Sequence, residues 1–146
     1  MYQKILIPMD GSREAEDVIT KIQPELTEST EVILLKVIPP LKGQRLGQLV
    51  VTAAEREEAE RIKAIDYFRG VINRLEGSPG QWQGGAIVSG SVPEGIASFA
   101  AQENVDLIAM YTHDRKGLAK LIRGSVAEKV KQSATTEVRV FPLESW

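Results

Sequence analysis

Short apolar segments alternate along this chain with longer segments of helical periodicity, and this alternation constrains the fold more than any other feature. Continuous apolar segments are typical of strands that are buried on both faces. Five strands are predicted, at residues 5–7, 32–38, 82–89, 106–110 and 137–141. Because helices separate them, the strands should run parallel, with helices on both faces of one sheet. The sequence therefore predicts a three-layer α/β fold with right-handed crossovers.

The residues at the ends of the helical segments indicate where the helices begin and end. Helices are predicted from Ser12 to about Gln23, over residues 49–75, from Val92 or Pro93, and over residues 125–133. Ser12 is a candidate N-cap, and Pro24 should end or kink the first helix. Residues 41–48, which contain two glycines, are expected to form a loop before the long second helix.

Composition excludes several classes of function. The chain has 146 residues, which suits a single domain, and a net charge of −2 gives no general basic surface for nucleic acid. The absence of cysteine excludes disulfides, thiolate metal sites and cysteine nucleophiles, and one histidine cannot form a multi-histidine site. No apolar segment approaches the roughly 20 residues of a membrane helix, and no signal peptide is recognised. We therefore expect a cytoplasmic protein with neither membrane nor nucleic-acid partners.

A basic segment ending in Gly124 and Ser125 follows the fourth predicted strand. Unpaired N–H groups at a helix N-terminus bind anions, so Gly124, Ser125 and Val126 are candidate phosphate contacts. The alternative is that Ser125 only caps the helix, and both roles are compatible. The same segment contains four basic candidates for the phosphate side, each of which would alone suit a solvated surface: Arg115, Lys116, Lys120 and Arg123.

Four segments in this order and spacing resemble the universal stress protein family: residues 2–12, 31–38, 90–96 and 124–130. The resemblance implies a five-stranded sheet of order 3-2-1-4-5, of the adenine nucleotide alpha hydrolase-like type. It also implies a stress-response regulator that binds ATP or a related adenine nucleotide, with magnesium only alongside the nucleotide. In that strand order, the first and fourth strands are neighbours at the topological switch point, where ligands bind at the carboxyl ends.

Several candidate site residues follow from this expected crevice. Pro8 and Asp10 end the first strand, and Met110 and Tyr111 end the fourth. The resemblance places Asp10 beside adenine, where its carboxylate would accept a hydrogen bond from the exocyclic amine. An equal alternative is that Asp10 braces the following turn. The resemblance also places the Val37 backbone against adenine, although an ordinary strand position would explain Val37 equally well.

The chain departs from the family's nucleotide motif, which is Gly-x-x-Gly, nine residues, then Gly-Ser or Gly-Thr. The spacing is intact, but Tyr111 and Asp114 replace the first two glycines. A tyrosine side chain can fill the space that glycine leaves, and a carboxylate repels phosphate unless Mg²⁺ bridges them. The sequence therefore predicts weakened or altered nucleotide binding. His113, the single histidine, suits local hydrogen bonding better than catalysis, and no catalytic or resident metal residue is predicted.

Three functions remain open at this point. A nucleotide-responsive stress protein is favoured by Asp10 and by Gly124–Ser125. A protein of the same fold that has lost the nucleotide and acts through an unknown protein partner is favoured by Tyr111 and Asp114. A slow ATPase is less favoured because no general base is evident. The edge strand at residues 137–141 predicts a homodimer, since an unpaired apolar edge invites pairing and the resemblance implies this contact. Glu137 stands where the family commonly has proline.

Overall fold

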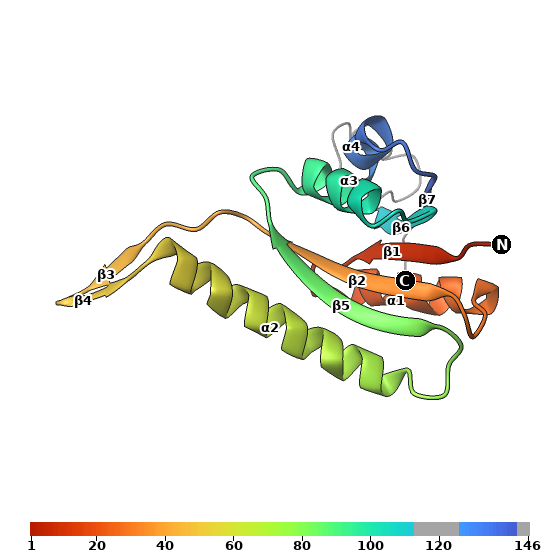
Figure 1. Ribbon diagram of the computed structural model, residues 1–146, viewed down its shortest axis with the longest axis horizontal. Coiled ribbons are helices and arrows are strands. Elements are labelled where there is room, and N and C mark those ends of the chain that lie inside the picture. Colours follow the sequence, from red (N-terminus) through yellow and green to blue (C-terminus); the bar gives the residue numbers. More distant parts are fainter. Residues whose placement is uncertain (113–125, 143–146) are drawn as a thin grey trace.

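The computed structural model describes residues 1–112 and 126–142. Its main sheet has five parallel strands in the order β5-β2-β1-β6-β7 (Figure 1). The strands are β1 (Lys4–Pro8), β2 (Glu31–Ile38), β5 (Gln81–Val88), β6 (Leu107–Thr112) and β7 (Val138–Pro142). Counted among the parallel strands alone, this order is 3-2-1-4-5, which confirms the predicted topology.

Helices cover both faces of this sheet. The described helices are α1 (Arg13–Ile22), α2 (Ala53–Arg74), α3 (Val92–Gln102) and α4 (Val126–Ser133), with a short 3-10 turn, η1 (Gln23–Glu25), after α1. Helices α1 and α2 pack on one face, and α3 and α4 pack on the other (Figure 1). The three-layer prediction is therefore confirmed, as are the Ser12 cap and the end of α1 before Pro24.

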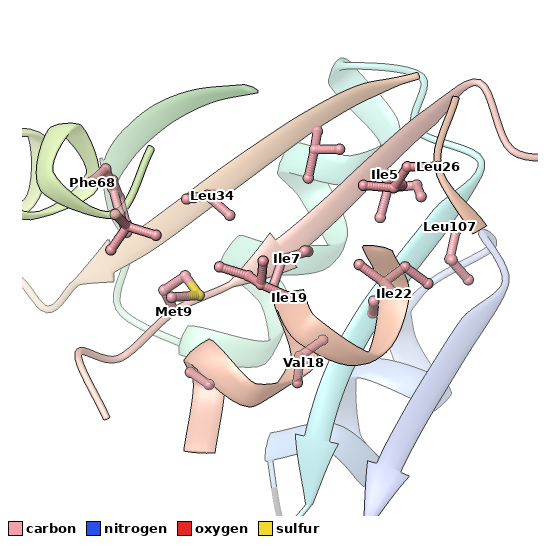
Figure 2. Packing of buried hydrophobic residues seen from close by; sticks show 14 residues of the cluster. Ile5, Ile7, Met9, Val18, Ile19, Ile22, Leu26, Leu34, Phe68 and Leu107 are labelled. Carbon is pink, nitrogen blue, oxygen red and sulfur yellow. The ribbon is translucent and has the colours of Figure 1, made fainter. Parts of the chain in front are cut away.

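Alternation along the central strands divides the core into two clusters. In β1, the side chains of Ile5 and Ile7 face α1 and α2 (Figure 2), whereas Leu6 faces α3 and α4. All three side chains are fully buried. Successive side chains in a strand point to opposite faces, so a strand covered on both sides must be apolar throughout. This explains why the central strands could be recognised as continuous apolar segments.

The predicted loop over residues 41–48 and the helix start at Leu49 are both wrong. An antiparallel hairpin of β3 (Gln44–Leu46) and β4 (Leu49–Val51) occupies this region, and α2 begins only at Ala53. Gly47 adopts a φ of +64°, which suits a two-residue hairpin turn.

A capping box fixes the actual start of α2. The Thr52 hydroxyl accepts a hydrogen bond from the Glu55 N–H at 3.1 Å, and the Glu55 carboxylate accepts one from the Thr52 N–H at 3.1 Å. This Thr-x-x-Glu pattern is a known helix-start signal, which the broad apolar periodicity of the segment obscured. Among the described helices, none combines the length and apolar character that crossing a membrane requires.

Candidate functional site

The carboxyl ends of β1 and β6 meet at one edge of the sheet. The two strands are parallel neighbours, with Ile5 paired to Leu107 and Leu6 paired to Ile108. Strand β2 lies on the other side of β1, so the chain order reverses between β1 and β6. Ligands in open α/β sheets bind at such a reversal. The structure thus brings the segments that contain Pro8, Asp10, Met110 and Tyr111 to the expected edge.

Asp10 braces the turn that leads from β1 into α1. Its Oδ1 atom accepts a hydrogen bond from the Ser12 N–H at 2.9 Å, across Gly11 with a φ of +85°. The Ser12 hydroxyl then accepts a hydrogen bond from the Ala15 N–H at 3.1 Å and caps α1. The turn-bracing alternative for Asp10 is therefore present in the structure, and it leaves the second carboxylate oxygen to face elsewhere.

That second oxygen is bound by Tyr111. The Tyr111 hydroxyl donates a hydrogen bond to Oδ2 of Asp10. The ring of Tyr111 packs against the core cluster beneath α1 and is half-buried. The side chain that replaces the first family glycine therefore ties β6 to the turn after β1 through the Asp10 carboxylate. The sequence indicated that a tyrosine could fill this space, but not that its hydroxyl reaches Asp10.

The hydrogen bond shifts the pKa values of both groups. Burial and the adjacent Asp10 carboxylate raise the pKa of the Tyr111 hydroxyl to about 12. Burial also raises the pKa of Asp10, but hydrogen bonds from Ser12 and Tyr111 outweigh it and hold that pKa below its ordinary value. At neutral pH, the tyrosine is thus a protonated donor and the aspartate an ionised acceptor.

Val37 presents its backbone to the same space. The Met9 N–H donates to the Leu35 carbonyl at 2.7 Å, so the polar backbone groups of Leu35 face β1. Alternate residues of a strand face the same neighbour, and Val37 therefore directs its N–H and C=O beyond the point where β1 leaves the sheet. The Ser89 N–H donates to the Ile38 carbonyl at 2.9 Å, which fixes the opposite orientation for Ile38.

The other candidates divide into those that the structure places and those that it does not describe. The Met110 side chain is buried beneath α3 and α4, so only its backbone is available at the edge. Val126 is the first described residue of α4 and is 42% exposed. Eight residues considered above lie outside the described part of the chain: His113, Asp114, Arg115, Lys116, Lys120, Arg123, Gly124 and Ser125. Over residues 1–112 and 126–142, no group of three acidic, histidine or cysteine side chains could hold a metal ion.

Comparison with known proteins places this geometry in a family. Residues 1–142 match the family model described as the universal stress protein family. The universal stress protein MJ0577 of Methanocaldococcus jannaschii is 30% identical over 153 residues, covering 96% of this chain and 94% of the relative. A solved structure of MJ0577 has a TM-score of 0.78 and 26% identity, covering 100% of this chain and 99% of that one.

Two further structures share the fold at lower identity. A universal stress protein in complex with cAMP has a TM-score of 0.70 and 17% identity, covering 96% of this chain and 97% of the other. A universal stress protein from Archaeoglobus fulgidus in complex with dAMP has a TM-score of 0.59 and 20% identity, covering 95% and 97%. The match to the family model over nearly the whole sequence decides the assignment. The chain belongs to the universal stress protein family.

Proposed function

We propose that this protein binds ATP or a related adenine nucleotide at the edge where β1 and β6 end, and that binding regulates a stress response through protein contacts rather than through fast turnover. The observation that carries the proposal is the convergence of an ionised Asp10 carboxylate and the outward-facing Val37 backbone on one edge. Family structures that hold cAMP and dAMP support an adenine ligand.

The two groups suit the edge of an adenine ring. The Val37 N–H and C=O form a donor and acceptor pair at fixed spacing, which matches a ring nitrogen and the exocyclic amine. Asp10, as a carboxylate, accepts hydrogen bonds only and so favours the amine over a carbonyl oxygen. Family resemblance assigns the phosphates to the N–H groups of Gly124, Ser125 and Val126, with magnesium arriving only with the nucleotide.

Tyr111 weakens this site in the proposed mechanism. The amine must share or replace the hydrogen bond that the Tyr111 hydroxyl donates to Asp10. A hydrogen bond to a charged group contributes roughly 1.5–3 kcal/mol, so the competition lowers affinity by about 10- to 100-fold. We therefore expect weaker nucleotide binding than a glycine at position 111 would allow.

Titration calorimetry with Mg-ATP tests the proposal. Tyr111→Phe should bind about 10-fold more tightly than the wild type, because Asp10 is released while the ring is kept. Asp10→Ala should abolish the gain when combined with Tyr111→Phe. Tyr2→Phe, at the amino end of the sheet, is the matched control and should leave affinity unchanged. Absence of binding heat in both the wild type and Tyr111→Phe would contradict the proposal.

The Tyr111–Asp10 contact is also the observation that favours the second candidate function. If this hydrogen bond has replaced the nucleotide permanently, the protein acts as a nucleotide-independent interaction protein of the same fold. Equal partner binding with and without Mg-ATP would favour that function. A phosphate-release assay on the same preparations addresses the less favoured slow ATPase.

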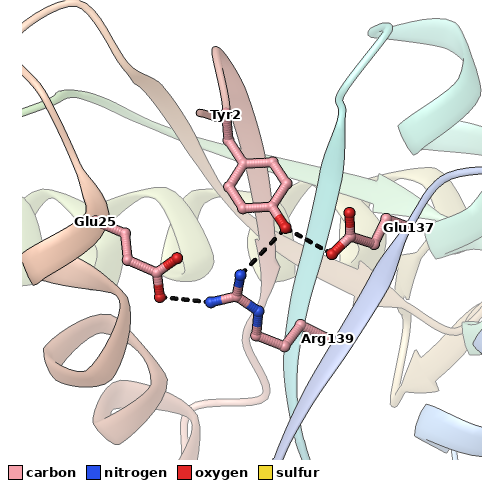
Figure 3. Close-up of polar contacts among 4 residues, drawn as sticks. All are labelled: Tyr2, Glu25, Glu137 and Arg139. Carbon is pink, nitrogen blue, oxygen red and sulfur yellow. Dashed lines mark hydrogen bonds and ion pairs between the residues drawn. The ribbon is translucent and has the colours of Figure 1, made fainter.

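We further propose a homodimer through the outer edge of β7. The Ile108 N–H donates to the Glu137 carbonyl at 2.9 Å, so Val138 and Val140 direct their backbone groups away from β6. A network on one face of β7 steadies the strand (Figure 3). The Tyr2 hydroxyl donates a hydrogen bond to the Glu137 carboxylate at 2.5 Å. The Arg139 guanidinium donates one to the Glu25 carboxylate at 2.5 Å and one to the Tyr2 hydroxyl at 3.1 Å.

A proline substitution in β7 tests this dimer. Val140→Pro removes one outward N–H while leaving the hydrogen bonds to β6 in place, so we expect it to dissociate the dimer. Val140→Ala keeps that N–H and should remain dimeric. Multi-angle light scattering distinguishes the outcomes, and a monomeric wild type at micromolar concentration would contradict the proposal.

A further inference from the structure

Helix α2 lies beside β5, at the edge of the sheet opposite to β7, and one of its flanks is exposed. The fully buried side chains of α2 are Phe68 and Val71, both in the second half of the helix. The first half projects beyond the sheet with the β3–β4 hairpin at its tip (Figure 1). Ile62, near the middle of α2, is 53% exposed. An isoleucine at that position contributes little to the fold of a single chain.

Ile62 belongs to a regular seam along the flank of α2. The seam residues recur at spacings of three and four, which is the pattern of helices that pack along their length: Glu55, Glu58, Ile62, Ile65, Arg69 and Ile72. A shallow cavity of about 180 Å³ opens along this flank. Ile65, Arg69 and Ile72 line it beside Gly84 of the edge strand β5. The flank thus offers apolar side chains and a cavity at the same place.

The charges of α2 are distributed unequally between its two halves. Residues 53–61 contain four acidic and two basic side chains, a net charge of −2. Residues 62–74 contain three basic side chains and one acidic, a net charge of +2. Two copies of this helix therefore attract each other when antiparallel and repel each other when parallel.

We propose that α2 packs antiparallel against α2 of a second copy of this chain. A two-fold axis between Lys63 and Ala64 places Ile62 opposite Ile65 of the second copy. The same axis places Glu58 opposite Arg69, and each contact occurs twice, as a two-fold interface requires. Ile62 of each copy then lies at the end of the cavity lined by Ile65 and Arg69 of the other.

A second copy of this chain complements the seam better than a partner whose surface is uniformly acidic or uniformly basic. From Glu58 to Arg69 the seam presents an acidic residue, two isoleucines and a basic residue in that order, and the reversed segment is its complement. The local ion pairs Glu58–Arg61 at 2.7 Å and Asp66–Arg69 at 3.3 Å join exposed side chains, so they contribute little and can exchange partners. The proposal is independent of nucleotide binding and of pairing through β7, since α2 lies at the other edge of the sheet.

The absence of cysteine permits a direct crosslinking test. In an Ile62→Cys variant, the two thiols lie one helical turn apart across the proposed axis, and oxidation should produce a covalent dimer. Val92→Cys, at an exposed apolar position on α3, is the matched control and should form no covalent dimer under the same conditions. Equal crosslinking of the two variants, or none at position 62, would overturn the proposal.

Charge exchange tests the antiparallel register. Glu58→Arg in the Ile62→Cys background should lower the crosslinking yield severalfold, because it faces Arg69 with a like charge. The further change Arg69→Glu should restore the yield. Failure of this restoration in a variant whose circular dichroism is unchanged would overturn the antiparallel pairing. In the Val140→Pro background, which lacks the proposed β7 pairing, Ile62→Asp should also weaken association by about 10-fold or more in sedimentation velocity.

Discussion

The two halves of helix α2 differ in what holds them in place. The second half is fixed by tertiary contacts: Phe68 and Val71 are buried, and Tyr67 and Arg74 donate hydrogen bonds to Glu16 of α1. The first half is fixed by its own capping box and by the segment that precedes the hairpin. Besides its capping box, Glu57 accepts a hydrogen bond from the Leu41 N–H at 2.9 Å, and Arg56 donates one to the Lys42 carbonyl at 2.5 Å. One continuous helix thus contains a core element and an exposed arm, and mutations should affect them by different amounts.

The largest expected effect lies in the buried half. Phe68→Ala should lower the free energy of unfolding by about 3–5 kcal/mol, because it removes a buried aromatic ring and leaves a cavity. Ile62→Ala, in the exposed seam, should change it by less than about 1 kcal/mol at protein concentrations where the chain is monomeric. Urea denaturation measures both values, and similar losses would show that the two halves are not distinct.

A smaller effect is expected where α2 meets β5. A Cβ atom added at Gly84 would lie 2.7 Å from Cβ and 2.8 Å from Cδ2 of Phe68. Gly84→Ala should therefore destabilise the protein by about 1–3 kcal/mol through overpacking. Gly85→Ala is the matched control, because its added Cβ would meet only Leu35 Cδ1, at 3.9 Å.

The double variant sharpens this prediction. If the clash with the Phe68 ring is the cause, Phe68→Ala, which removes the ring but keeps Cβ, combined with Gly84→Ala should lose less stability than the sum of the single changes. Additive losses would mean that the ring is not the cause, which leaves the Cβ atom that alanine retains at position 68 or the backbone conformation of Gly84.

The exposed half should respond to the loss of its cap. Thr52→Ala should cost about 1 kcal/mol, since the hydroxyl no longer accepts the Glu55 N–H. Hydrogen exchange should accelerate in the first turn of α2 and remain unchanged near Val71. Thr52→Ser keeps the hydroxyl and should behave as the wild type, whereas faster exchange throughout α2 would show that the halves unfold together.

The smallest effect is expected from the surface ion pairs. Lys63 and Glu60 lie 3.4 Å apart, with their side chains 74% and 44% exposed. A double-mutant cycle on this pair should give a coupling energy below about 0.5 kcal/mol that decreases with added salt. A coupling energy that is larger and does not decrease with salt would indicate that this ion pair contributes substantially to the stability of α2.

Prediction from sequence succeeded for strands that are buried on both faces and failed for the exposed hairpin. Strands β1 and β2 were recognisable because both faces of each require apolar side chains, and the topology followed from helices separating parallel strands. The second strand of the hairpin was missed because Leu49 and Val50, although exposed, suited the apolar pattern of the following helix, and the first strand was missed because Leu46 lies in the segment of residues 41–48 predicted as a loop. The Thr52–Glu55 capping box was the available signal.

At the candidate site, the positions of the residues could be predicted from the sequence, but the contacts between their side chains could not. Placing Asp10 and Tyr111 at one edge required only the strand order. The Tyr111 hydroxyl binds one oxygen of Asp10, and the Ser12 N–H binds the other. These contacts depend on side-chain orientation, which the spacing of residues along the chain does not predict.

The order of apolar and helical segments by itself determined the α/β class, the parallel sheet and the edge where its chain order reverses, because hydrophobic periodicity and chain connectivity are local and topological properties. Only the tertiary structure decided which side chains meet across that edge, where α2 begins and which flank of α2 is left unpaired. Those outcomes depend on contacts between residues far apart in the chain, such as Tyr111 with Asp10 and Phe68 with Gly84, whose distances arise only when the layers pack.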